Sequence, residues 1–274
     1  MTPAYLTHFG LSAAPFTKEI ADNDLWLPAS KSQLVDTLVE AVDEHSSVIL
    51  VGEPGVGKTC VLRALRHRLP QAGFRLTYCH NATLGRRDFY RQLCLALGLS
   101  PNATAAAVFF AVSKHVEDLG RERVHPVFLL DEAHLLHQDT LDHLHILLNY
   151  QWDSRALLSL VLVGLPELDD RLAARRNRSL YSRVPHRLHV APLTPEDTAE
   201  YLRLRLTRAG CDRELFSSDA IAMLHETASG ALRDIDRVAT AALREAARKK
   251  KKLVERDTLA SICDADAERP GLES

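Results

Sequence analysis

The chain has 274 residues, of which 46% are hydrophobic and 26% charged, and its formal net charge at pH 7 is −2. This composition indicates a soluble globular protein of one large or two modest domains. The net charge is too close to zero for the protein to attract nucleic acid through its overall charge. No apolar run reaches the roughly 18 residues that a membrane-spanning helix needs. The five cysteines are scattered without a CxxC pair, and the first residues lack a secretory signal. We therefore expect a cytoplasmic protein with no membrane partner.

Residues 1–46 are expected to form an N-terminal extension. Residues 8–11 and 14–16 interrupt any periodicity, which predicts loops with apolar anchors. From about residue 30 to residue 44 the apolar side chains recur on one face of a helix, and Ser30 is a candidate cap for it.

A glycine-rich stretch follows the apolar run 48–51 and precedes a helical pattern that extends to about Leu69. Strand, glycine-rich loop and helix is the context of a phosphate-binding loop, in which backbone N–H groups and the helix dipole face an anion. We expect Lys58 to contact the β- and γ-phosphates of ATP and Thr59 to hold Mg²⁺. The residues expected to bind the nucleotide are Gly52, Glu53, Pro54, Gly55, Val56, Gly57, Lys58, Thr59 and Cys60.

Apolar strands and amphipathic helices alternate through residues 47–192, which predicts an α/β core with a parallel sheet covered by helices on both faces. Ligands of such sheets bind beyond the carboxyl ends of the strands. The expected strands are 48–51, 74–79, 127–130, 157–163 and 187–190, and the expected helices between them are 86–97, 103–118 and 138–150.

The alternation of strand and helix patterns ends at Pro192. Thr194 is a candidate helix cap with Pro195 at the first helical position. No strand pattern follows, so residues 193–274 are predicted to form a small all-helical domain. Its expected helices are 195–208, 218–228, 231–250 and 256–265.

The apolar strand 127–130 ends in two carboxylates, Asp131 and Glu132. A carboxylate in the first position is suited to hold Mg²⁺ beside the phosphates. The second is then placed to orient an attacking water or accept its proton. An acidic cap of the next helix is the alternative, but the pair follows a complete phosphate loop by about 70 residues, which favours a catalytic role.

These two motifs resemble the Walker A and Walker B motifs of the AAA+ ATPases, and the helices after Pro192 resemble the lid of that family. Three further segments resemble the ExeA-like group, which is similar to the transposition helper ATPases called MuB, IstB, TniB and TnsC. They are His8-Phe9-Gly10-Leu11, Asp131-Glu132-Ala133-His134 and Leu162-Val163-Gly164.

The resemblance implies roles for three further residues. Arg183 matches the arginine finger that acts on a neighbouring subunit's γ-phosphate, with Arg178 as its rival. Arg233 matches the sensor 2 arginine of the lid, and Asn81 matches the polar residue that holds Glu132 away from water. Gly164 stands where the family usually has a polar side chain, which implies either slow hydrolysis or a neighbouring group that aligns the water.

The resemblance also implies that copies of the chain assemble with ATP, as a hexamer, ring or helical filament, around duplex DNA and recruit or regulate a transposase. The expected DNA contacts are Arg86, Arg87 and Thr104, and the alternative for the arginines is an ordinary basic helix start. The basic run 248–252 is either a second contact or a helix end complemented by cations.

Two other functions stay open. ExeA-like ATPases also serve secretion or envelope assembly, although that class normally carries a transmembrane helix and a wall-binding domain that this sequence lacks. A replication initiator or clamp-loader-like ATPase is the third possibility.

Overall fold

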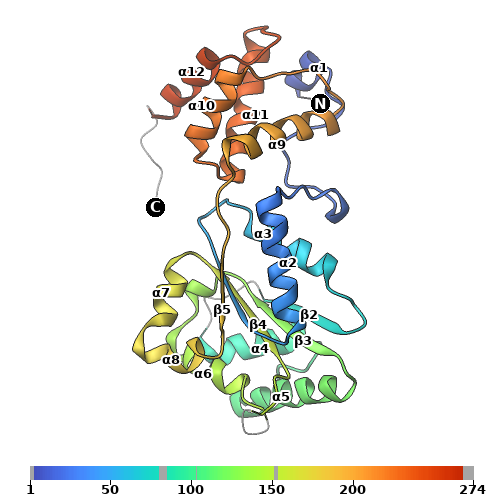
Figure 1. Cartoon of the computed structure of the whole chain (residues 1–274), viewed down its shortest axis with the longest axis vertical. Coiled ribbons are helices and arrows are strands. Elements are labelled where there is room, and N and C mark those ends of the chain that lie inside the picture. The colour runs from blue at the N-terminus through green and yellow to red at the C-terminus, as the bar shows by residue number, and fades with distance from the viewer. Residues whose placement is uncertain (1–2, 80–84, 103, 151–153, 268–274) are drawn as a thin grey trace. The chain divides into compact units, whose positions relative to one another are not determined.

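The computed structural model describes residues 3–79, 85–102, 104–150 and 154–267, and it divides the chain into two compact units (Figure 1). Unit 1 contains the N-terminal segment, part of the phosphate loop and the C-terminal helices. Unit 2 contains the sheet. The ranges are Met1–Pro28, Pro54–Gly57 and Ala191–Ser274 for unit 1, and Ala29–Glu53 and Lys58–Val190 for unit 2.

The core of unit 2 is one sheet of five parallel strands in the order β2-β3-β4-β1-β5. Every residue of β1, β3 and β4 is buried, as expected for a parallel sheet with helices on both faces. The predicted α/β class is therefore confirmed. The strands are β1 (Val48–Val51), β2 (Phe74–Cys79), β3 (His125–Leu130), β4 (Ser159–Gly164) and β5 (His186–His189).

The helices of unit 2 pack on the sheet through apolar stripes. Phe128 and Leu130 of β3 belong to a cluster of buried residues that also holds Leu93, Val112 and Leu144 from three helices. The expected helix ranges agree with the structure within three residues, but two short helices after β4 escaped prediction. The helices are α2 (Ala29–Asp43), α3 (Lys58–Arg68), α4 (Arg86–Ala96), α5 (Ala105–Arg121), α6 (Gln138–Leu147), α7 (Glu167–Ala173) and α8 (Arg178–Tyr181).

Unit 1 is helical in its described residues. A capping box between Thr194 and Asp197, with Pro195 at the first helical position, begins the first helix of the C-terminal part, as predicted. Its helices are α1 (Ala4–Phe9), α9 (Pro195–Arg208), α10 (Ser218–Ala228), α11 (Leu232–Arg248) and α12 (Arg256–Ala267), with a 3₁₀ turn η1 (Asp22–Asp24).

The loop predicted at residues 8–11 was wrong for His8 and Phe9, which are the last two residues of helix α1 (Ala4–Phe9). Six residues are too few for a periodic pattern to emerge, and Gly10, with φ +71°, ends the helix. The expected apolar anchors are present, because Phe9 and Leu11 are buried in the same cluster as residues of α9 and α11. The buried Arg205 fixes the segment by donating to the carbonyls of Pro15 and Thr17. The N-terminal segment is thus an integral part of unit 1.

None of the helices in the described ranges combines the length and apolar character needed to cross a bilayer. All five cysteines are free thiols.

Gly230, between α10 and α11, has φ +69°, and a Cβ atom there would lie 2.4 Å from the carbonyl oxygen of Leu193. Replacing Gly230 by Ala should therefore destabilise unit 1 by about 2–4 kcal/mol, from backbone strain and a backbone clash. Chemical denaturation followed by circular dichroism measures the effect. Gly10→Ala is the matched control, since its φ is similar but no atom of the described residues lies within 4 Å of an added Cβ. It should cost only about 1 kcal/mol, and equal losses for both variants would contradict the clash.

Candidate nucleotide-binding site

The phosphate loop connects β1 to α3. Gly55 and Gly57 have φ of +81° and +100°, a conformation that side chains rarely tolerate, so glycine is required at both positions. The ammonium of Lys58 donates to the carbonyls of Gly52 at 2.7 Å and Glu53 at 3.1 Å, which holds it beside the loop. Because Lys58 is also the first residue of α3, the positive end of that helix adds to its charge. This arrangement fits a polyphosphate.

The two carboxylates after β3 are held differently. Both oxygens of Asp131 accept hydrogen bonds, Oδ1 from the N–H of Glu132 at 2.9 Å and Oδ2 from the hydroxyl of Tyr78 at 2.6 Å. Glu132 has φ +53°, an unusual backbone conformation for a residue other than glycine, and its side chain is 51% exposed. The first carboxylate is therefore fixed and the second projects toward solvent.

Tyr78 is a site residue that the sequence analysis missed. Burial and the hydrogen bond to Asp131 raise the pKa of its hydroxyl, so this group stays protonated and donates. Its role follows from the pairing of β2 with β3, which the sequence alone does not give. Tyr78 pairs with Leu129 in the parallel register, and side chains alternate along a strand, so Tyr78 shares a sheet face with Asp131.

The oxygen donors fit Mg²⁺. Asp131 offers an oriented carboxylate, and Thr59 places a hydroxyl in the exposed first turn of α3. Among the described residues, no cluster of three or more metal-ligating side chains exists. One carboxylate and one hydroxyl is instead the kind of set that Mg²⁺ uses when phosphates and waters complete its coordination.

His134 is the last residue of the segment 131–134 that resembles the ExeA-like group. It lies in a 3₁₀ turn, η2 (Ala133–Leu135), with its side chain 14% exposed. The N–H of Leu165 donates to Nδ1 of its ring at 3.4 Å, and its Nε2 lies 3.7 Å from Oε2 of Glu132. The structure thus brings together His134, Glu132 and the end of β4, which the sequence pattern did not reveal.

Arg233 lies beside the phosphate loop within unit 1. Its backbone N–H donates to the carbonyl of Gly55 at 3.2 Å, and its side chain is exposed. A long-range backbone contact of this kind leaves no local trace in a sequence.

Arg183 lies after α8 and donates to the carbonyl of Ser179 at 3.0 Å. Its rival, Arg178, is exposed at the start of the same helix. Asn81 lies outside the described residues. Neither arginine is excluded by these contacts, because the role expected of them acts on another copy of the chain.

The expected DNA contacts lie at two helix starts. Arg86 and Arg87 are exposed, and neither forms a side-chain ion pair within the described part of the chain. Asp139 accepts from the backbone N–H of Arg86 at 3.4 Å, so a carboxylate already complements this helix end. Thr104 caps α5 by accepting from the N–H of Ala107.

The basic run 248–252 ends helix α11. Arg248 and Lys249 pair with Glu245, and Lys251 pairs with Glu255 and Asp257. Three of these five cations are thus locally neutralised, which favours the interpretation as a helix end complemented by cations.

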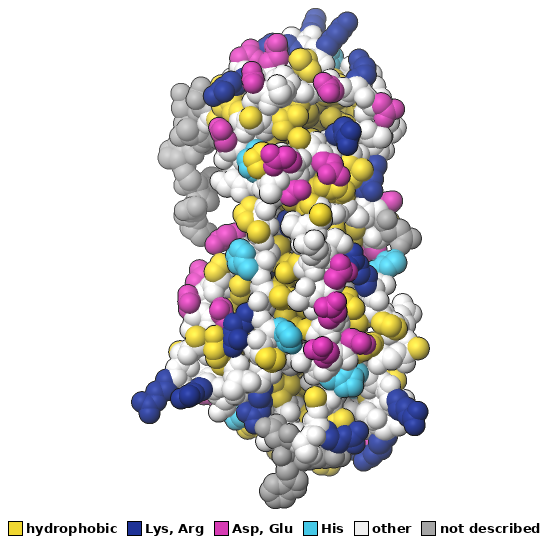
Figure 2. Space-filling model, in the orientation of Figure 1, with side chains coloured by type: hydrophobic (Ala, Val, Ile, Leu, Met, Phe, Trp, Pro, Cys, Tyr) yellow, Lys and Arg dark blue, Asp and Glu magenta, His cyan; other side chains and the backbone are white. Residues whose placement is uncertain are grey.

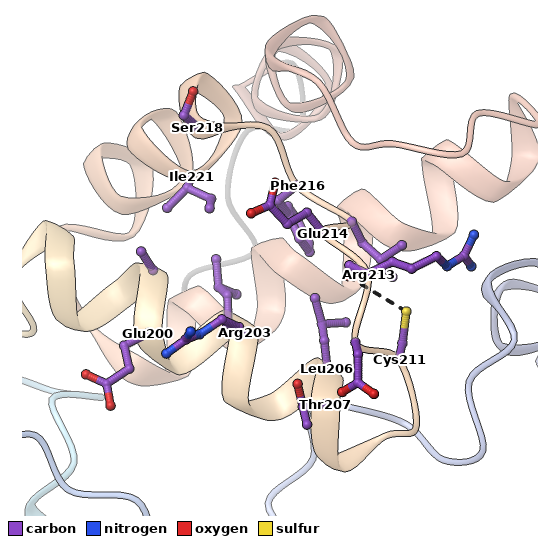
Figure 3. Close-up of a pocket in the computed structure, with 14 residues that line it drawn as sticks. Glu200, Arg203, Leu206, Thr207, Cys211, Arg213, Glu214, Phe216, Ser218 and Ile221 are labelled. Carbon is purple, nitrogen blue, oxygen red and sulfur yellow. Dashed lines mark hydrogen bonds between the residues drawn. The ribbon is translucent and has the colours of Figure 1, made fainter.

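Unit 1 also holds a cavity of about 480 Å³ between α9 and the segment that leads into α10 (Figure 3). Leu206, Phe216 and Ile221 line its apolar part, and Glu200 and Arg203 are among the charged residues around it. It contains none of the residues that the motifs predicted.

Comparison with known proteins agrees with this geometry. Residues 40–172 match the family described as "AAA domain". Residues 40–172 therefore carry an AAA domain. It is 33% identical over 244 residues to general secretion pathway protein A of Aeromonas hydrophila, a match that covers 87% of this chain. The chain spans only 44% of the length of that relative.

Solved structures share the AAA+ fold. The Aeropyrum pernix ORC1 protein in complex with DNA matches with a TM-score of 0.65 and 21% identity, over 93% of this chain and 69% of that one. The Thermotoga maritima RuvB Holliday junction branch migration motor matches with a TM-score of 0.60 and 15% identity, over 92% and 73% of the two chains. At these identities the likeness establishes the fold alone.

Replacing Tyr78 by Phe removes the hydroxyl that donates to Asp131 and keeps the ring. The magnesium concentration for half-maximal ATP hydrolysis should rise by roughly 10-fold, because groups that orient a metal-binding carboxylate typically contribute about 10- to 100-fold. Titration of magnesium at saturating ATP measures it. Tyr90→Phe is the control, since the buried Tyr90 hydroxyl has no hydrogen-bond partner among the residues that the structure describes. An unchanged magnesium dependence in Tyr78→Phe would mean that Tyr78 does not orient Asp131.

Proposed function

We propose that this AAA+ domain binds MgATP at residues 52–60 and hydrolyses it. The observation that carries the proposal is the pair after β3, in which a doubly hydrogen-bonded Asp131 precedes a projecting Glu132. Asp131 and Thr59 would hold Mg²⁺, which when bound neutralises charge on the phosphates. Lys58 would contact the β- and γ-phosphates. Glu132 would orient the attacking water and accept its proton.

The lid and a neighbouring copy would complete the site. Arg233 is suited to reach the phosphates in the same chain, since its backbone already contacts Gly55. Arg183, or Arg178, would contribute a guanidinium to the γ-phosphate bound by the next copy. Such a residue makes hydrolysis depend on assembly, because a lone subunit lacks the charge that stabilises the transition state.

We infer further that the assembled protein binds duplex DNA and recruits or regulates a transposase. Support for DNA comes from Arg86 and Arg87, which are exposed and lack ion-pair partners in the described ranges. The electrostatic attraction of one copy for DNA is weak, because its net charge is −2. Both basic and acidic side chains are present on the face drawn in Figure 2. DNA binding would therefore depend on several copies that act together.

A second candidate function is an ATPase of secretion or envelope assembly. The observation that favours it is the 33% identity to general secretion pathway protein A. The two functions share the nucleotide site and differ in the partner, so DNA retention by the purified protein separates them.

Replacing Lys58 by Ala should weaken ATP binding by roughly 10- to 100-fold, the value of a charge-assisted hydrogen bond of about 1.5–3 kcal/mol. ATP-dependent retention of duplex DNA should disappear with it, as measured by fluorescence anisotropy at fixed salt. Lys18→Ala is the control, because Lys18 is exposed and lies outside the phosphate loop and the candidate DNA contacts. Retention equal to wild type would refute nucleotide control of DNA binding. If wild type itself retains no DNA, the secretion function is favoured.

Replacing Glu132 by Gln should leave ATP binding intact and reduce hydrolysis by roughly 10²- to 10⁴-fold, the usual contribution of a general base.

Replacing Arg183 by Ala should also abolish hydrolysis, but a mixture of the Arg183→Ala and Glu132→Gln variants should partly recover it. Recovery is expected because a Glu132→Gln subunit can lend its arginine to the intact site of an Arg183→Ala neighbour. Steady-state phosphate release across mixing ratios measures it, with Arg178→Ala as the matched comparison. Recovery only with Arg178→Ala would assign the role to that residue, and no recovery in either series would exclude action between subunits.

A further inference from the structure

The ring of His134 fills the space beside the end of β4. Gly164 ends this strand, and a Cβ atom there would lie 3.2 Å from both the backbone nitrogen and Nδ1 of His134. A larger residue would thus push the histidine away, so the absence of a side chain at 164 is what admits the ring. The carbonyl of Gly164 accepts from the N–H of Gly52 at 3.2 Å, which ties the same strand end to the start of the phosphate loop.

The hydrogen bond that the ring accepts from Leu165 assigns its tautomer. The N–H of Leu165 can only donate, so Nδ1 of His134 must accept and carry no proton. The neutral ring then bears its proton on Nε2, the atom that lies 3.7 Å from Oε2 of Glu132. This distance exceeds a hydrogen bond by less than about 1 Å, which a rotation of the half-exposed Glu132 side chain can close.

The histidine is held more firmly than the glutamate. Arg171 of α7 donates to the carbonyl of His134 at 2.8 Å, and the buried Asn177 donates to the carbonyl of Arg171 at 2.8 Å. The side chain of His134 is 14% exposed, against 51% for Glu132. A fixed donor beside an adaptable acceptor can set the direction in which the acceptor points.

We propose that His134 is a positioning residue for Glu132. Its Nε2–H donates to Oε2 of the carboxylate and leaves Oε1 to accept the proton of the attacking water. His134 in turn is aimed by the backbone of Leu165, so the end of β4 acts on the glutamate through the ring rather than through a side chain of its own. This inference rests on the proposed catalytic role of Glu132.

Three substitutions separate donation from packing. His134→Asn keeps an acceptor for the N–H of Leu165, but its side chain is too short to reach Glu132. His134→Gln offers an amide donor at about the reach of the histidine Nε2. His134→Ala removes both the acceptor and the donor. For His134→Asn and His134→Ala, kcat for ATP hydrolysis should fall by roughly 10- to 100-fold with KM for ATP nearly unchanged, and His134→Gln should recover much of the loss. Leu135→Ala, in the same turn and 48% exposed, is the control and should keep wild-type kcat.

A spectroscopic measurement on the nucleotide-free protein tests the tautomer directly. In ¹⁵N spectra of histidine-labelled protein, the signal that disappears in His134→Gln should show a protonated Nε2 and an unprotonated Nδ1. A ring protonated at Nδ1 and unprotonated at Nε2 would overturn the proposal, since it could then neither accept from Leu165 nor donate to Glu132.

The outcomes distinguish this inference from the function on which it rests. If Glu132→Gln is inactive while all three His134 variants hydrolyse ATP as wild type does, the positioning role is wrong and the role of Glu132 stands. If Glu132→Gln hydrolyses at the wild-type rate, both are wrong. If kcat for His134→Gln is as low as kcat for His134→Ala while the unfolding midpoints of both match wild type, donation from position 134 does not support hydrolysis and the proposal is wrong.

Discussion

The position of β4 between β1 and β3 is the constraint on which the site depends. The phosphate loop follows β1 and the carboxylates follow β3, and these strands are not neighbours. Adjacent strands lie about 4.8 Å apart, so the two motifs are held roughly 10 Å from each other, with only the end of β4 between them. A triphosphate with its cation is of the size to span such a gap. The order of strands in a buried sheet thus sets the distance between the loop proposed to bind phosphate and the carboxylates proposed to act on it.

The carboxylates depend on interactions that a linear motif does not contain. Glu132 occupies a left-handed backbone conformation, which costs of order 1–3 kcal/mol unless its surroundings enforce it. Here the N–H of Glu132 is bonded to Asp131, and Asp131 is bonded in turn to Tyr78 on the neighbouring strand. The strained residue is therefore stabilised through the pairing of β2 with β3. The conformation also turns the glutamate away from the strand axis, so the strain is part of how the side chain comes to project.

The sequence revealed the parts of this fold that local patterns encode. Glycine at positions of positive φ, apolar runs that end in carboxylates, and the capping box at Thr194 are all short-range features, and the strands and larger helices followed from them. Tyr78 and His134 could not be assigned in the same way. The first matters because of the parallel register with β3, and the second because Gly164 leaves room for a ring. Helix α1 escaped for a different reason, since its stability comes from a core shared with residues far along the chain.

The charge pattern of the folded surface differs from the charge pattern of the sequence. Most of the cations in the run 248–252 pair with acids in or near their own helices, so a concentrated basic run in the sequence does not become a basic patch in the fold. The arginines at the start of α4 remain unpaired within the described residues, but two guanidiniums on one copy contribute little affinity at physiological salt. Counterion release grows with the number of phosphates contacted, so a row of copies would bind far more tightly than one. Under the proposed function, a nucleotide that controls assembly would control DNA affinity without contacting the proposed DNA contacts, and a weakly charged protein would bind a polyanion in an ATP-dependent way.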